Sequence, residues 1–404
     1  MKRLALKFGG TSVGSEEKIK NVAKIIKKRH SENNEIIVIV SAMAGVTNEL
    51  HKKSNLISKN FDRKELDVLL SSGEQVSCSL LSGAIIDLGL KARSWLGWQI
   101  PIVTNEDYNS SRITKIKTDE ILKFISEGGV AVIPGFQGIT KGDRITTLGR
   151  GGSDLSAVAT AKFFKTDSCE IYTDVEGVFT TDPSINSKAK KIDKISYEEM
   201  LEMSSLGAKV MQPASVQASM NYNIPVHVRS SFSEKNGTLI TPETEIDYNK
   251  AVTGITYSKN DAKITLVGVV DKPGVAADIF EPLGSNKINV DMVVQSTSPD
   301  GKKTDVTFTI KREDLAKTIN LIGETNKKLN YVKLIHDDKV SKVSIIGAGM
   351  IANPGVTHKM FRSLANEKIN ILAISTSEIK ISVLINEELT QNAIKILHKT
   401  FELN

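Results

Sequence analysis

The stretch Leu4-Ala5-Leu6-Lys7-Phe8-Gly9-Gly10-Thr11-Ser12 decides how the fold begins. Its short apolar start favours a buried strand, and the glycines that follow predict a tight loop. Two glycines let backbone N–H groups approach a phosphate closely, and a helix expected from Ser15 adds a positive N-terminus. Lys7 supplies a mobile positive charge for the terminal phosphates of a nucleotide. The order is not that of a P-loop, because Lys precedes the glycines, and an ordinary tight turn is the alternative.

Short apolar runs alternate with helical patterns over the first 250 residues. This alternation predicts an α/β fold with a mostly parallel central sheet and helices on both faces. Ligands bind such sheets at the carboxyl ends of the strands. We expect strands at residues 4–8, 35–40, 100–104, 130–134 and 169–173, and helices at 15–30, 45–58, 65–89, 118–126 and 153–164.

The C-terminal part contains an internal repeat. An offset of 81 residues (354 minus 273) aligns Pro273-Gly274-Val275 with Pro354-Gly355-Val356, and Lys287-Ile288-Asn289 with Lys368-Ile369-Asn370. Each copy reads as a strand, a Pro-Gly loop, a helix, two strands and a helix. The first copy has one more strand, and residues 252–257 are the segment left to supply its counterpart. We therefore expect a catalytic domain at 1–248 and a regulatory region at 249–404, in which copy 264–338 is inserted into a copy formed by 251–258 and 340–404.

A second glycine-rich motif, Leu148-Gly149-Arg150-Gly151-Gly152-Ser153-Asp154-Leu155, opens an amphipathic helix. Three glycines around an arginine predict an anion nest at the start of that helix. Ser153 or Asp154 as an ordinary helix cap is the alternative. A cap does not explain Arg150, whose planar guanidinium suits a carboxylate bidentately.

Further polar segments follow other predicted strands or open helices. Ser41-Ala42-Met43-Ala44-Gly45-Val46-Thr47 follows the second strand, so its hydroxyl groups are expected at the same sheet edge. Glu74, the strand-to-loop segment 171–183 and Lys209 would each be unremarkable alone, as a helix charge, a surface loop and a solvated side chain.

Taken in order, these motifs closely resemble those of the aspartokinase family of the amino-acid-kinase superfamily. The C-terminal duplication resembles the paired ferredoxin-like ACT domains of that family, so the resemblance covers essentially the whole chain. The segments that carry it are Lys7–Val13, Ser41–Thr47, Ser71–Glu74, Gly149–Asp154, Thr173–Pro183 and Gly207–Val210.

The resemblance implies transfer of the γ-phosphoryl group of ATP to the side-chain carboxylate of L-aspartate, the first step towards lysine (through diaminopimelate), threonine and methionine. It implies catalytic roles for Lys7, Asp154 and Lys209, with Asp154 orienting the two lysines. Phe179 and Ser184 stand where some family members have Tyr and Arg near ATP. The ATP-binding residues implied are Lys7, Phe8, Gly9, Gly10, Thr173, Asp174, Phe179, Lys209 and Val210, and those for aspartate are Ser41, Thr47, Glu74, Arg150 and Ser153.

The chemistry implied agrees with what the sequence lacks. A carboxylate nucleophile with a pKa of about 4 is already ionised at neutral pH, so no positioned histidine base is expected. Bringing an anion up to ATP requires lysines, backbone N–H groups and Mg²⁺. Because Mg²⁺ keeps several waters and bridges phosphates, no dedicated protein metal motif is expected.

The repeats resemble a module that binds lysine or threonine between the ACT domains of two subunits, which implies a homodimer or higher oligomer. A purely structural dimerisation module is the alternative. The effector residues implied are Asp271, Gly274, Val275, Ala276, Asn289, Val290, Asp291 and Gln295, with Asn370, Ile371 and Ser377 completing the pocket.

Composition excludes several other classes of protein. A net charge of +6 spread along the chain and 5% aromatic residues argue against nucleic-acid binding. No apolar run is long enough for a signal peptide or a membrane span, so a cytoplasmic protein is expected. Cys78, Cys169 and the six histidines form no metal-ligand spacing.

Other functions fit parts of the sequence. A dinucleotide-binding oxidoreductase is suggested by the glycine-rich stretch 345–352, but Pro354 and Gly355 interrupt the helix it would have to open. A catalytically silent amino-acid sensor is disfavoured by four intact charged residues, which are Lys7, Arg150, Asp154 and Lys209. Acetylglutamate kinase and glutamate 5-kinase are the nearest enzymatic alternatives.

Overall fold

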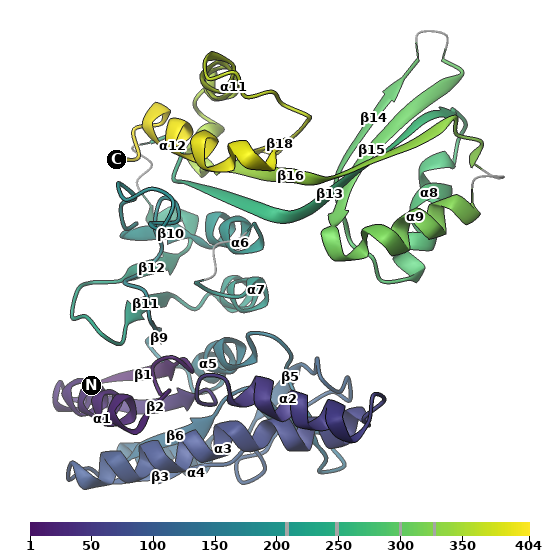
Figure 1. The fold of residues 1–404 in the computed structure, drawn as a ribbon. Helices are drawn as coiled ribbons and strands as arrows, with labels where there is room; N and C mark the ends of the chain where they lie inside the picture. Colours follow the sequence, from purple (N-terminus) through teal and green to yellow (C-terminus); the bar gives the residue numbers. More distant parts are fainter. Residues whose placement is uncertain (207–209, 247–249, 299–300, 326–328) are drawn as a thin grey trace. The chain divides into compact units, whose positions relative to one another are not determined.

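The computed structural model describes residues 1–206, 210–246, 250–298, 301–325 and 329–404 (Figure 1). The chain forms two compact units. The first comprises Met1–Val178 and Lys191–Asp247, and the second comprises Phe179–Lys190 and Tyr248–Asn404. Segment 179–190 lies within the expected catalytic domain of residues 1–248, yet it packs as part of the second unit.

The first unit is built on a mostly parallel sheet, as the strand–helix alternation predicts. Parallel pairing joins β9, β1, β2 and β6 in its centre, and among the described strands of this sheet only β11 and β12 pair antiparallel. The strands run in the order β10 (Lys194–Ser196), β12 (Thr238–Thr241), β11 (Val226–Ser230), β9 (Ser168–Thr173), β1 (Lys2–Phe8), β2 (Asn34–Val40), β6 (Val130–Pro134) and β3 (Ala92–Ser94).

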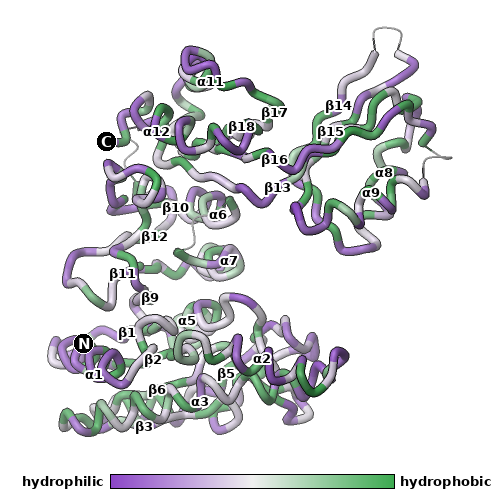
Figure 2. The backbone as a smooth tube through the Cα atoms, viewed as in Figure 1, coloured by the Kyte–Doolittle hydropathy of each residue, from purple (hydrophilic) through white to green (hydrophobic). Residues whose placement is uncertain are grey.

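Strand alternation sends side chains of β1 to opposite faces of this sheet. Leu4, Leu6 and Phe8 pack in one buried cluster with α1 (Glu16–Ser31) and α3 (Arg63–Asp87). Lys7 therefore faces the other side, where α5 (Gly152–Phe163) packs against β1. In Figure 2 the tube is hydrophobic along much of β2 and β6, whereas α1 is largely hydrophilic.

Four of the five expected strands lie in this sheet. The fifth, expected at 100–104, is β4 (Ile102–Thr104), and it lies in a separate small sheet. Its apolar residues did not reveal which sheet it joins, because that depends on non-local pairing.

The small sheet has the order β5 (Ile113–Ile116), β4, β7 (Gln137–Ile139) and β8 (Ile145–Thr147). The other described helices of the unit are α2 (Val46–Ile57), α4 (Asp119–Ser126), α6 (Tyr197–Ser205) and α7 (Pro213–Tyr222).

One continuous sheet joins the two sequence repeats in the second unit. The start of β13 pairs with the end of β16, as Gly254 with Ile346 and Tyr257 with Val343. The later part of β13 pairs with β15 and with the start of β16. The strand order is β14 (Val290–Thr297), β15 (Lys303–Lys311), β13 (Gly254–Val270), β16 (Lys333–Ile346), β18 (Lys380–Asn386) and β17 (Ala373–Thr376).

Each repeat has its own hydrophobic core. Helices α8 (Val275–Ser285) and α9 (Leu315–Glu324) cover one, and α11 (Val356–Asn366) and α12 (Thr390–Thr400) cover the other. The repeat is visible in the backbone, because Gly274 and Gly355 begin α8 and α11 with φ of 91° and 98°. Glycine suits these positions, since a left-handed conformation strains other residues.

Segment 179–190 is hydrogen-bonded to the second repeat and packs against its core. Ile255 donates a backbone hydrogen bond to the Thr180 carbonyl at 2.7 Å. The Thr180 hydroxyl lies 2.8 Å from Nε2 of His398, which is fully buried, and Ile185 packs against the same core. Residues 179–190, which include the predicted nucleotide-binding residue Phe179, thus belong to the second unit.

Among the described residues, no helix is both long and apolar enough to cross a membrane. Both cysteines are buried and unpaired.

Candidate active site

A cavity of about 540 Å³ opens among the loops that follow β1 and β2 in the first unit. It brings together motifs separated by more than a hundred residues of sequence. All five residues expected to bind aspartate line it, and so do two of the three expected catalytic residues, Lys7 and Asp154. The third, Lys209, lies outside the described residues. The expected residues that line the cavity are Lys7, Gly10, Ser41, Thr47, Glu74, Arg150, Ser153 and Asp154.

Lys7 and Asp154 form an ion pair in this cavity. The Lys7 Nζ atom lies 2.5 Å from Oδ1 of Asp154, and only 10% and 11% of the two side chains are exposed. Asp154 lies in the first turn of α5, which packs on the face of the sheet to which Lys7 points. The carboxylate thus fixes the direction of the Lys7 ammonium group.

The loops after β1 and β2 pack closely. Ser41 donates a backbone hydrogen bond to the Phe8 carbonyl, and Ala44 donates one to the Gly10 carbonyl, both at 3.1 Å. A Cβ atom on Gly10 would lie 2.8 Å from the Ala42 carbonyl oxygen, closer than a side chain tolerates. Gly10 is therefore required for this close approach of two backbones.

Glu74 lies in the middle of α3 rather than near its N-terminus, so the helix dipole does not account for it. Its side chain is 3% exposed, and Oε2 has no hydrogen-bond partner among the described residues. Burial raises the pKa of Glu74 to about 7, although the backbone N–H of Ala42 partly opposes this shift. A buried carboxylate with a free oxygen lining a cavity suits a cationic group of a ligand.

The Arg150 loop connects β8 to α5. Gly149 and Gly151 have φ of 75° and 71°, and Gly151 is the N-cap of α5. Ser153 and Asp154 are therefore inside the helix and are not its cap, which rules out the simple capping alternative. The Arg150 side chain is exposed to the cavity, and the described residues include no ion-pair partner for it.

Other residues expected to bind ATP lie elsewhere. Phe8 is buried and stacks on Tyr172 with ring centroids 4.7 Å apart, and the Gly9 N–H donates to the Tyr172 carbonyl. Thr173 ends β9 beside β1, and its hydroxyl donates to Asp174 at 3.1 Å. Phe179 belongs to the second unit. Lys209 lies outside the described residues, whereas Val210 is described as half-buried next to them.

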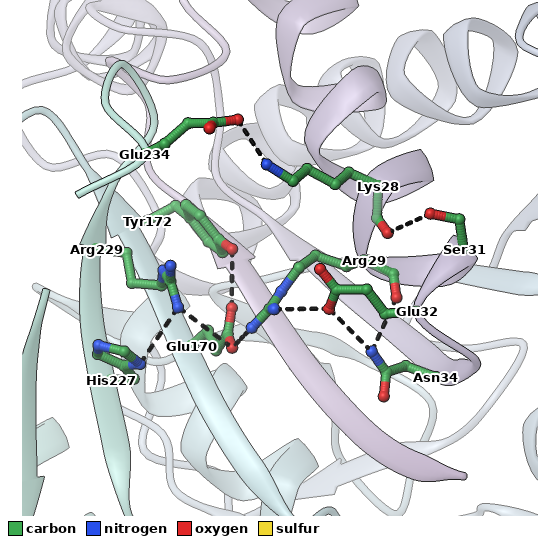
Figure 3. A network of polar contacts seen from close by, with 10 residues as sticks. All are labelled: Lys28, Arg29, Ser31, Glu32, Asn34, Glu170, Tyr172, His227, Arg229 and Glu234. Carbon is green, nitrogen blue, oxygen red and sulfur yellow. Dashed lines mark hydrogen bonds and ion pairs between the residues drawn. The ribbon is translucent and has the colours of Figure 1, made fainter. Parts of the chain in front are cut away.

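A polar network links α1 to β9, next to the Gly9–Gly10 loop that follows β1 (Figure 3). Glu170 of β9 is 3% exposed and forms an ion pair with Arg29 of α1. The Tyr172 hydroxyl donates to Glu170 at 2.8 Å, and burial together with this carboxylate raises the pKa of Tyr172. Because Tyr172 also contacts Phe8 and Gly9, the network supports the end of β1 from the opposite face.

Several cavity residues escaped the sequence reasoning. Asn48 and His51 lie on α2, one residue and four residues beyond the expected Thr47, so His51 is about one turn away and on the same helix face. Their helical spacing from Thr47 was the available signal. Asn109, Phe136 and Thr147 also line the cavity, but they come from loops and strands whose position the sequence does not reveal.

The expected effector residues of the first repeat lie around the start of α8 and on β14. Gly274 caps α8, and Val275 is its first residue. Val290, Asp291 and Gln295 lie on β14, at an edge of the sheet. The Asp291 carboxylate forms an ion pair with the ammonium group of Lys342, whose side chain is 6% exposed. Asp271 lies in the loop before α8, Ala276 lies in α8, and Asn289 directly precedes β14.

The expected residues of the second repeat lie around the opposite edge strand. Asn370 and Ile371 precede β17, and Ser377 lies in the turn between β17 and β18. Met292 of β14 packs in one cluster with Leu372 and Ala373, so the two edge regions approach each other within the unit.

The described residues contain no group of three or more His, Cys, Asp or Glu side chains that could hold a metal ion. The cavity instead offers Lys7, Arg150 and the positive end of α5. These positive groups favour an anionic ligand in the cavity.

Comparison with protein families divides the chain much as its fold does, except that segment 179–190 falls within the kinase match and packs in the second unit. Residues 2–230 match the amino acid kinase family, and residues 264–325 and 343–401 match the ACT domain. The two ACT matches coincide with the two hydrophobic cores of the second unit.

Individual relatives agree along the whole chain. The aspartate kinase of Pseudomonas putida is 44% identical over 405 residues, covering 100% of this chain and 98% of that protein. Escherichia coli aspartokinase III in complex with aspartate and ADP (R state) has a TM-score of 0.81 at 25% identity, covering 100% of both chains. The same enzyme in complex with lysine and aspartate (T state) has a TM-score of 0.78 at 25% identity, covering 99% of each. The chain therefore belongs to the aspartate kinase family and is a phosphotransferase with an amino-acid-kinase fold followed by ACT domains.

Proposed function

We propose that this chain transfers the γ-phosphoryl group of ATP to the side-chain carboxylate of L-aspartate, yielding 4-phospho-L-aspartate. The observation that carries the proposal is the convergence of the Lys7–Asp154 pair, Glu74 and Arg150 on one cavity. Its support is the aspartokinase III structure that holds aspartate and ADP. The product would open cytoplasmic synthesis of lysine, threonine and methionine.

The cavity offers one partner for each charged group of aspartate. Arg150, which has no ion-pair partner among the described residues, would hold the α-carboxylate in a bidentate contact. Glu74, with its free buried oxygen, would hold the α-ammonium group. Ser41, Thr47 and Ser153 would donate or accept the remaining hydrogen bonds. The side-chain carboxylate is then left to face Lys7.

Lys7 and the glycine loop would bind the phosphates of ATP. The Lys7 ammonium group neutralises negative charge on the transferring phosphoryl group, and Asp154 holds it in place. Lys209 and Val210, with Thr173, Asp174 and Phe179, are proposed to complete the nucleotide site. Since the attacking carboxylate is ionised at neutral pH, no side chain has to remove a proton.

Magnesium is proposed as the accompanying ion. When bound, it would supply positive charge that offsets repulsion between the nucleotide and the approaching carboxylate. Asp154 is already paired with Lys7, so we propose that phosphate oxygens and water provide most of its ligands.

The direct test is ADP release on mixing the protein with MgATP and L-aspartate, with trapping of the acyl phosphate by hydroxylamine. Turnover with L-aspartate, but not with L-glutamate or N-acetyl-L-glutamate, supports the proposal. Preference for either glutamate compound would favour the two rival kinases. Binding of aspartate without any ADP release would favour a silent sensor.

We further propose that lysine, threonine or both inhibit the enzyme at the ACT domains, in a homodimer or larger oligomer. The proposal is supported by the charge of the Asp291 carboxylate, which forms an ion pair with the Lys342 ammonium group and would suit the ammonium group of an amino-acid effector. Aspartokinase III has been solved with lysine bound. Titrating activity with lysine, threonine and both, and measuring mass by light scattering, tests both parts. Inhibition that is unchanged in Asp291→Ala would place the effector elsewhere.

A further inference from the structure

Asp67 is a fully buried carboxylate that does not line the cavity, yet two of its partners do. Its Oδ2 accepts the backbone N–H groups of Asn109 at 3.0 Å and Thr147 at 2.9 Å. Its Oδ1 accepts the Thr147 hydroxyl at 2.5 Å and the Asn109 side-chain amide. An ionised carboxylate only accepts hydrogen bonds and can take about four, so these four donors satisfy it completely.

Both partners of Asp67, Asn109 and Thr147, lie directly beside the loop that carries Arg150. Thr147 ends β8, and Arg150 follows only three residues later. The Asn109 carbonyl oxygen lies 3.0 Å from where a Cβ atom on Gly149 would be, so the two backbones touch. Asn109 itself has a φ of 67°, a strained conformation for a residue other than glycine. The four hydrogen bonds of Asp67 therefore hold a strained turn against the Arg150 loop.

Asp67 and Glu74 lie on the same face of α3, seven residues or two turns apart. At about 1.5 Å of rise per residue, the helix separates them by roughly 10 Å. Arg150 and Glu74 are proposed to bind the carboxylate and the ammonium group on one carbon atom of aspartate. The distance between Arg150 and Glu74 must therefore stay constant. One rigid helix, α3, carries both Glu74 and Asp67, the residue that supports the Arg150 loop.

We propose that Asp67 is a positioning residue that fixes Arg150 relative to Glu74 and so determines the affinity for aspartate. The inference rests on the proposed function, because it assumes that Arg150 binds the substrate. It predicts an effect on aspartate that the nucleotide does not share, since Asp67 touches neither the glycine loop nor Lys7.

The experiment compares Asp67→Ala, Asp67→Asn and Asn109→Gly in the full chain, with KM for aspartate and for MgATP measured separately. Asp67→Ala should raise the KM for aspartate at least about tenfold. Asp67→Asn should raise it less, because its carbonyl oxygen still accepts both backbone N–H groups. Asn109→Gly permits the same φ but loses the side-chain amide, which also bonds to Arg63, so it should raise the KM for aspartate at least as much as Asp67→Asn. The KM for MgATP should stay within about twofold.

Asp62→Ala is the matched control. Asp62 caps the same helix by accepting the N–H groups of Lys64 and Glu65, and it does not contact Asn109 or Thr147. It should weaken α3 without a selective effect on aspartate. An unchanged KM for aspartate in folded Asp67→Asn and Asn109→Gly would overturn the inference, as would an equal rise in both KM values. A wild-type chain that does not phosphorylate aspartate would instead refute the proposed function.

Discussion

The ammonium group of Lys7 lies 2.5 Å from the carboxylate of Asp154, and both side chains are about nine-tenths buried. Removing one partner of a buried pair leaves an uncompensated charge, which costs about 3–5 kcal/mol. Loss of activity in a single variant would therefore mix a catalytic defect with instability. The pair allows the two effects to be separated.

Lys7→Met should lower kcat by roughly a hundred- to a thousandfold or more, as expected when a group that stabilises the transition state is lost. It should also lower the free energy of unfolding. The double variant Lys7→Met/Asp154→Asn should regain most of that stability but not the activity. Urea denaturation and steady-state kinetics of the wild-type protein and the two variants check this. Recovered turnover in the double variant would show that Lys7 only compensates Asp154.

Arg150→Ala should mainly raise the KM for aspartate. A charge-assisted hydrogen bond is worth about 1.5–3 kcal/mol, which corresponds to a rise of roughly 10- to 150-fold. Arg144→Ala is a suitable control, because Arg144 forms an exposed ion pair with Glu65 and does not line the cavity. If both variants had the same small effect, Arg150 would not be a substrate ligand.

Glu74 predicts a pH dependence of aspartate binding. Burial raises its pKa to about 7, and only the ionised form attracts an ammonium group. The dissociation constant for aspartate should therefore increase as pH falls below about 7, approaching tenfold per pH unit. Calorimetric titrations from pH 5.5 to 8.5 measure it. Glu74→Gln should bind weakly and lack this pH dependence, so a slope that persists in the variant would assign it to another group.

The raised pKa of Glu74 also predicts that this residue lowers the stability of the folded protein when no substrate is bound. A carboxyl group with a pKa of 4.5 when unfolded and about 7 when folded binds a proton more tightly in the folded state. Between these values stability falls as pH rises, by about 3 kcal/mol in total. Glu74→Gln should therefore be more stable than the wild-type protein at pH 8, and nearly equal to it at pH 4.5. Urea denaturation at the two pH values gives the comparison.

Local patterns predicted much of the first unit. Apolar runs such as Leu4–Phe8 are buried strands, and the polar residues at or just after their ends, Lys7 and Ser41 among them, meet at one sheet edge. This succeeds because parallel strands all present their carboxyl ends on the same side. The repeat offset likewise predicted equivalent helix starts at Gly274 and Gly355.

Features that depend on distant contacts escaped prediction. Asp67 looks in the sequence like any acid in the first turns of a helix, and only tertiary structure reveals Asn109 and Thr147 as its partners. Residues 100–104 have the composition of a central strand but pair in the small sheet. The end of segment 171–183, taken alone, is typical of a surface loop, whereas the burial of Thr180 and the packing of Ile185 against the core place residues 179–190 in the second unit.

That segment yields the last prediction, which concerns Thr180 and His398. The Thr180 hydroxyl accepts the Lys190 N–H at 3.0 Å and lies 2.8 Å from Nε2 of fully buried His398, whose Nδ1 lies 2.9 Å from Oδ1 of Asn404. Thr180→Val keeps the shape but leaves a buried ring nitrogen without a partner, at a cost of about 1–3 kcal/mol. Amide hydrogen exchange at Lys190 and Ile255 should therefore become faster.

Acid should loosen the segment in the same way. Burial lowers the pKa of His398 from its ordinary value of 6.5, despite the opposing hydrogen bond to Asn404. Its stabilising contribution is complete above about pH 6.5 and decreases as pH falls below that value, because the unfolded histidine then binds the proton first. Thr181→Val is the control, since the buried Thr181 hydroxyl has no hydrogen-bond partner among the described residues. Exchange should stay slow in that variant. Equal acceleration in both, or none in Thr180→Val, would mean that the hydrogen bond to His398 does not hold residues 179–190 in the second unit.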